Sequence, residues 1–140
     1  MPYCGANPVA DMWSEKAMSL LATSFRAAVQ DGEDRDARGA MARAATFAGR
    51  GFGDAGVHIP HANAYPIAGQ VRDVHPDGYL EDEPMVPHGM AVSLTAPAAF
   101  RFTFEAAPER HLRAAQLLDP GAERPADDLA AILRDSLELE

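Results

Sequence analysis

The sequence predicts an all-α protein built as a helical bundle. Apolar residues recur at helical spacing, and proline and glycine mark the turns between the helical segments. Residues 100–104 alternate as a strand would, but five residues with no second strand to pair with cannot form a sheet. With 140 residues the chain has the size of one ordinary domain. We therefore expect a single helical domain over residues 1–140.

The first helix is expected to begin after Asn7, an N-cap residue, with Pro8 at the first helical position, where its missing N–H has no cost. Asp31 and Gly32 should end it. Apolar residues between these ends follow a period near 3.6, which predicts one buried face: Val9, Met12, Trp13, Ala17, Leu20, Leu21, Phe25 and Val29.

The second helix is expected over residues 36–52 and is rich in alanine and glycine. Because glycine weakens a helix, the glycines near its end indicate either close backbone contact with a neighbour or ligand, or fraying of the helix end. We expect this helix to pack against the third, with Ala45 on the buried face.

The third helical segment contains the run GVHIPHANAYP at residues 56–66, and Pro60 and Pro66 should bend or interrupt it. A long surface loop rich in Pro, Gly and Asp follows Gly69. Further helices are expected at 87–100, 108–118 and 126–137.

Charge and composition exclude several classes of function. The net charge of −9 argues against a nucleic-acid partner, because phosphate binding needs a basic face. No apolar run approaches a membrane span, and the N-terminus lacks a secretion signal, so we expect a cytoplasmic protein with no membrane partner. The single cysteine, Cys4, forms no intrachain disulfide and is expected to be a bystander thiol. The acidic residues 81–83 are expected to be solvated, with a hard-cation site as the alternative.

Two histidines stand out as candidate metal ligands. His58, His61 and Tyr65 share roughly one helical face, and His88 lies 27 residues after His61 in the first turn of the next helix. A helix N-terminus favours uncharged imidazole, which is the form that binds metal. From spacing alone, these histidines are either ligands or satisfied polar residues. His75 and His111 lack such neighbours and are expected at the surface. His58 is either a third ligand or a residue that packs beside the ligands.

Four sequence segments resemble the helical domain of the iron-containing (group III) alcohol dehydrogenases and occur in the same order as in that family: NPVADMWSEKAMSLL, GVHIPHANAYPIAG, VPHGMAV and PERHLRAAQLL. Within that group they are most similar to the hydroxyacid-oxoacid transhydrogenase subgroup. The resemblance runs from about residue 2 to residue 118. It implies a helical domain that binds a divalent metal, iron or zinc, beside NAD(P).

The resemblance also assigns the site residues. His61 matches the first residue of the family's H-x-x-x-H word and His88 matches the histidine of its PHG word, so both would be metal ligands. Phe52 matches a position beside the nicotinamide ring. Tyr65 stands where many members carry a second histidine. The transhydrogenase-like members also have tyrosine at this position, and we assign Tyr65 a catalytic role.

The family's other two ligands, an aspartate and a histidine, belong upstream of the matched segment, as does the N-terminal α/β dinucleotide-binding domain. No GxGxxG word is present here. Two functions remain open: the metal-binding helical part of a dehydrogenase acting on a small alcohol or hydroxyacid, or a non-catalytic helical remnant or interaction module. We expect a homo-oligomer or a partner chain that supplies the missing domain.

Overall fold

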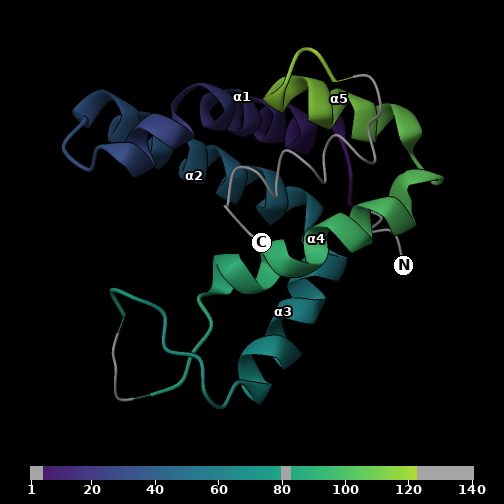
Figure 1. The fold of residues 1–140 in the computed structure, drawn as a ribbon. Helices are drawn as coiled ribbons and strands as arrows, with labels where there is room; N and C mark the ends of the chain where they lie inside the picture. The colour runs from purple at the N-terminus through teal and green to yellow at the C-terminus, as the bar shows by residue number, and fades with distance from the viewer. Residues whose placement is uncertain (1–4, 80–82, 123–140) are drawn as a thin grey trace.

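The computed structural model describes residues 5–79 and 83–122, and all of the regular structure in these ranges is helical (Figure 1). The five helices are α1 (Pro8–Gln30), α2 (Arg35–Ala55), α3 (Ile59–Gln70), α4 (His88–Phe104) and α5 (Pro108–Leu118). The all-α prediction is confirmed. The helix expected at 126–137 lies outside the described residues.

Side-chain caps set the starts of the first two helices. The Asn7 side chain accepts hydrogen bonds from the backbone N–H groups of Val9 and Ala10 at 3.0 and 2.9 Å. Asp34 caps α2 in the same way. These caps satisfy N–H groups that have no partner inside the helix, so both starts are fixed locally.

The end of α2 comes three residues later than the sequence predicted. The helix continues through Phe52 to Ala55 and stops at Gly56, whose φ is 79°. Glycine adopts this positive φ without the steric cost that a Cβ brings, so it ends the helix there.

The pairing of α1 with α2 is the largest helix contact, and the prediction that α2 packs on α3 is wrong. The reason is the set of small residues on α2 at helical spacing, which gives a narrow face that α1 can approach. Ala44 lies on that face and is 2% exposed, whereas Ala45 is exposed. The buried residues of the pair are Ala10, Ala17, Ala37, Ala40, Ala44 and Gly51.

Gly51 marks the closest approach of the two helices. A Cβ at this position would overlap Ser14 Oγ and lie 3.3 Å from the Ala10 carbonyl oxygen. The prediction of close backbone contact therefore holds at Gly51. At Gly49 a Cβ would meet no described protein atom within 4 Å, so the expected contact with a neighbouring helix is wrong there.

The hydrophobic core has no large side chain that is fully buried among the described residues; its fully buried members are alanines. Trp13 and Phe47, from α1 and α2, stack with ring centroids 5.4 Å apart and remain partly exposed. Three residues of the predicted buried stripe of α1 are exposed: Val9, Met12 and Val29. None of the described helices combines the length and apolar character that crossing a membrane requires.

The second helix pair is α3 and α4. Pro60 lies in the first turn of α3, where its missing N–H has no helical partner, and α3 continues through Pro66 without interruption. Of the two expected outcomes, an interruption is therefore wrong, and a bend stays a prediction. Residues 100–104 continue α4, which passes through Pro97 and buries Ala96 and Ala99. Helical packing thus overrides the strand-like alternation.

Helix α5 begins and ends where the sequence predicted. It lies against α1, to which two arginines bind: Arg110 pairs with Asp11, and Arg113 pairs with Glu15 at 2.7 Å. Figure 1 shows α1, α2 and α5 together in the upper part of the molecule, with α3 and the first half of α4 below them.

Candidate metal centre

His61 and His88 are brought together by the pairing of α3 with α4. His61 lies in the first turn of α3, and His88 is the first residue of α4. One turn further on, Ala64 and Ala91 are buried at 1% and 0% exposure. Because these side chains are small, the two helix starts can lie close together. The imidazole centroids are 5.3 Å apart, with 57° between the ring planes.

Burial, and then the neighbouring His88, lower the pKa of His61 below its ordinary value. Each cause disfavours the charged ring. Both causes therefore favour the uncharged form of His61, which is the form that can coordinate a metal ion.

Tyr65 lies one turn after His61 on α3 and completes a cluster of three rings. Its ring centroid is 6.3 Å from that of His88, and the side chain is 70% exposed. We call His61, Tyr65 and His88 the ring cluster. Its tyrosine lies at the solvent-exposed edge.

Phe52, the residue predicted beside a nicotinamide, lies in the last turn of α2 and is 53% exposed. Within residues 5–79 and 83–122 it makes no ring contact with the cluster. The structure therefore brings three of the four predicted site residues together, without a described ring contact to Phe52.

His58 is the N-cap residue of α3, and its side chain makes no capping hydrogen bond. Its pKa is lowered by burial first, then by the charges of His61 and His111. No three His, Cys, Asp or Glu side chains of the described residues are arranged to hold a metal ion. Among these residues, His58 therefore does not complete a three-ligand set with His61 and His88.

His111 was predicted at the surface, and this prediction is wrong. Its ring is half-buried, with the Nδ1 atom 2.9 Å from the Ala107 carbonyl oxygen and the Nε2 atom 3.0 Å from Thr103 Oγ1. The rings of Phe100 and Phe104 lie edge-on to it. A histidine four residues after a helix N-cap was the available sequence signal for the Ala107 contact, but Thr103 and the two phenylalanines lie on the preceding helix.

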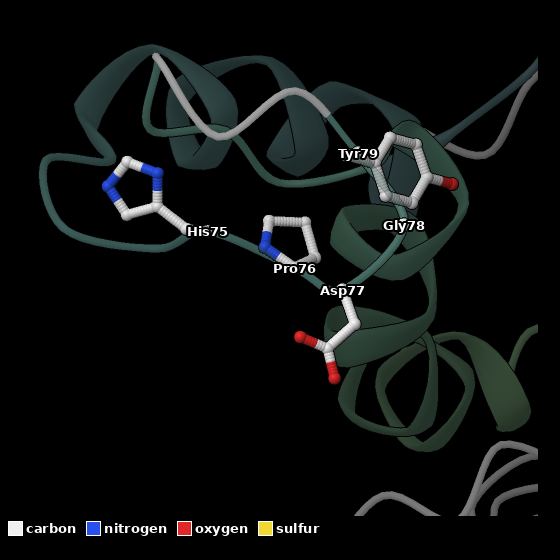
Figure 2. Close-up of a pocket in the computed structure, with 5 residues that line it drawn as sticks. All are labelled: His75, Pro76, Asp77, Gly78 and Tyr79. Carbon is white, nitrogen blue, oxygen red and sulfur yellow. The ribbon is translucent and has the colours of Figure 1, made fainter.

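The loop between α3 and α4 contains a hollow of about 320 Å³ at residues 75–79. His75, Asp77 and Tyr79 line it but point in different directions (Figure 2). His75 is exposed, as predicted. The side chains do not converge on a common point, so the hollow offers no catalytic or metal-binding arrangement. Of the acidic residues 81–83, only Glu83 lies in the described part of the chain, where it is exposed.

Comparisons with known proteins agree on one family. A family model described as "Fe-containing alcohol dehydrogenase family, C-terminal" matches residues 3–138. The hydroxyacid-oxoacid transhydrogenase of Xenopus laevis is 48% identical over 138 residues, and that of Homo sapiens is 42% identical over 136. Both matches cover 96% of this chain and 29% of the relative, so the chain spans less than a third of these proteins.

Solved structures give the same result. A 1,3-propanediol oxidoreductase superposes with a TM-score of 0.80 at 28% identity, over 96% of this chain and 33% of the other. An alcohol dehydrogenase from Oenococcus oeni superposes with a TM-score of 0.76 at 27% identity, over 99% of this chain and 34% of the other. The similarity therefore extends over nearly all of this chain and a third of each longer one.

Proposed function

The chain belongs to the Fe-containing alcohol dehydrogenase family, and on that premise we propose that it is the metal-binding helical part of an NAD(P)-dependent dehydrogenase. The similarity to hydroxyacid-oxoacid transhydrogenases supports that subgroup and a small alcohol or hydroxyacid as the substrate. The observation that carries the proposal is the close approach of His61 and His88 at the starts of two packed helices.

The donor set fits a divalent iron or zinc ion. Imidazole nitrogen suits both metals, and the lowered pKa of His61 keeps its ring uncharged. Two ligands are fewer than the three or four that protein sites for these metals use. We propose that His61 and His88 supply two ligands and that the others come from a part of the enzyme outside the described residues.

In the complete enzyme, the bound metal would supply Lewis-acid polarisation of the substrate oxygen, and NAD(P) would accept the hydride. This chain would orient the reactants. Tyr65 places a phenol next to His88, where it can donate a hydrogen bond to a substrate oxygen or accept one from a substrate hydroxyl. Phe52 would offer an apolar ring to the nicotinamide, provided that α2 is brought towards the ring cluster.

The direct test is metal affinity by titration calorimetry, with Zn²⁺ and with Fe²⁺ under anaerobic conditions. We expect the unmodified chain to bind either ion and the His61→Ala/His88→Ala variant to lose that binding. His75→Ala is the matched control, because His75 is an exposed loop histidine outside the cluster. Equal binding by all three proteins would contradict the assignment. No binding by any of them would favour the second function, a non-catalytic helical remnant or interaction module.

We further propose that this helical part acts with a partner, either a second copy or a chain carrying the dinucleotide-binding domain. Exposed large apolar side chains support this, since such surfaces drive association: Phe52, Met90, Leu94 and Phe102. Static light scattering of the purified chain at high concentration should give a mass above that of a monomer. A monodisperse monomer would contradict self-association. The cytoplasmic location remains a prediction.

A further inference from the structure

The ring cluster lies on a unit that is joined to the rest of the molecule by two short connections. The unit comprises α3, α4 and the described part of the loop between them, residues 59–79 and 83–104. The chain reaches it through residues 56–58 and leaves it through residues 105–107. We infer that α3 and α4 swing as one body against α1, α2 and α5, with these two connections as hinges.

The backbone at each connection can turn without breaking a helix. Gly56 has a φ of 79°, and its N–H binds the Phe52 carbonyl oxygen at 2.6 Å, which closes α2 just before the first connection. At the second connection, α4 ends in a turn in which Ala106 N–H binds Thr103 O and Ala107 N–H binds Phe104 O, both at 3.1 Å. Hinges are typically a few residues of this kind at the ends of helices.

Packing within each body is more extensive than packing between the two bodies. Helix α1 packs on α2 along their length and is held to α5 by two ion pairs, and α3 packs on α4. Among the described residues, the main helix contact between the bodies is the small one of α4 with α5. There Phe100 packs against the cluster formed by Ala115 and Ala122.

The His111 side chain contacts residues at both ends of the second connection. The Ala107 carbonyl oxygen can only accept a hydrogen bond, so Nδ1 carries a proton and donates it there. In the neutral ring, Nε2 is then an acceptor for the Thr103 hydroxyl of α4 at 3.0 Å, and the one proton of this hydroxyl is shared with the Ala99 carbonyl oxygen, also at 3.0 Å. The Phe100 and Phe104 rings lie 6.2 and 5.8 Å from the imidazole, edge-on in both cases. We call these interactions the corner contact.

The swing would change the distance between Phe52 and the ring cluster, because Phe52 precedes the first hinge and His61 follows it. This consequence for NAD(P) and metal placement rests on the proposed function. The swing itself rests only on connections and packing, so either idea can fail without the other.

The experiment measures spin-label distances in the full chain with Cys4 replaced by serine. One label pair, Thr46→Cys with Ala98→Cys, joins α2 to α4 across the hinges. The other, Ala68→Cys with Ala98→Cys, lies inside the hinged unit. All three positions are exposed. Pulsed electron–electron double resonance then gives a distance distribution for each label pair. Each distribution is measured in the chain with an intact corner contact and in a variant that lacks it.

We expect His111→Ala to broaden the Thr46–Ala98 distribution and lengthen its mean, with no change in the Ala68–Ala98 distribution. Arg110→Gln is the matched control, because it removes an ion pair from the neighbouring position of α5 without touching the corner contact. It should change neither distribution.

Three results would overturn the inference. One is an unchanged Thr46–Ala98 distribution in His111→Ala. Another is equal broadening of both label pairs, which would mean loss of the fold and not a swing. The third is an Arg110→Gln variant that broadens the Thr46–Ala98 distribution as much as His111→Ala, since the corner contact would then have no special role.

Discussion

The pair α1 and α2 differs from the pair α3 and α4 in how each is stabilised. The first pair has side-chain caps at both starts, a face of small residues and a close backbone approach at Gly51. The second has no side-chain cap at either start, carries Pro66 and Pro97 inside its helices, and exposes the ring cluster. Stabilising features thus concentrate in one pair and candidate chemical groups in the other, as in proteins whose sites lie on less stable elements.

The largest expected effect tests the tight packing of α1 on α2. Ala44→Leu adds three carbon atoms to a position that is 2% exposed, and overpacking of this kind costs about 1 to 3 kcal/mol of unfolding free energy. Ala45→Leu, at an exposed position of the same helix, should change it by less than about 0.5 kcal/mol. Urea denaturation of both variants measures the difference. Equal losses would contradict the burial pattern of α2.

The next effect tests the close approach at Gly51. Gly51→Ala places a methyl group against Ser14 and the Ala10 carbonyl, so we expect destabilisation of about 1 kcal/mol or more. Gly53→Ala, two residues later in open space, should stabilise by up to about 1 kcal/mol because alanine favours helix. Thermal melts of both variants test this prediction, because the melting temperature should fall for Gly51→Ala and rise for Gly53→Ala. Stabilisation by both substitutions would mean that the helices are further apart than described.

A smaller effect tests the lack of a cap in the second pair. His58 is the N-cap of α3 but makes no capping hydrogen bond. His58→Asn supplies a good capping side chain and should raise the unfolding free energy by up to about 1 kcal/mol at neutral pH. Asn7→Ala, which removes the cap of α1, should lower it by about 1 kcal/mol. A His58→Asn variant less stable than the parent would show that the histidine stabilises α3 in another way.

The smallest effect concerns pH. The folded-state pKa values of His58 and His61 are below the ordinary value of 6.5, so the unfolded chain binds more protons as the pH falls below that value. Their contribution is therefore complete above about pH 6.5 and is lost as the pH falls through their folded-state pKa values. Metal-free denaturation at about pH 7.5 and 5.5 should show lower stability at the acid pH. His61→Gln should reduce this difference, because it removes one of the two groups whose pKa is lowered in the folded chain.

Local signals in the sequence predicted the helix starts well. Asn7 and Pro8 are the N-cap and the first residue of α1, so the signal lies at the helix start itself. Helix α5 likewise begins with a proline, and it was predicted at its observed bounds. The partner of α2 was missed because a repeat of small residues shows which face is buried but not which helix covers it. Proline was overweighted in α3, since one of its two prolines lies in the first turn, where it is tolerated.

The candidate site was only partly predictable. Periodicity placed His61 and Tyr65 on one face of α3, but His88 is 27 residues further along, and its proximity to His61 depends on the alanines that let α3 and α4 pack closely. From the sequence, only the family resemblance assigned these three residues to one site. The contacts of His111 depend on the angle between α4 and α5, which local patterns do not specify.

The alanine core also affects how the chain should unfold. A methyl side chain hides little apolar surface, so unfolding exposes less of it than in a domain whose interior holds leucine and phenylalanine. The heat-capacity change and the denaturant dependence of the unfolding free energy both scale with newly exposed surface. The purified chain should therefore show a broad thermal transition and a shallow urea curve for its length, and a partner that covers its exposed apolar residues should sharpen both.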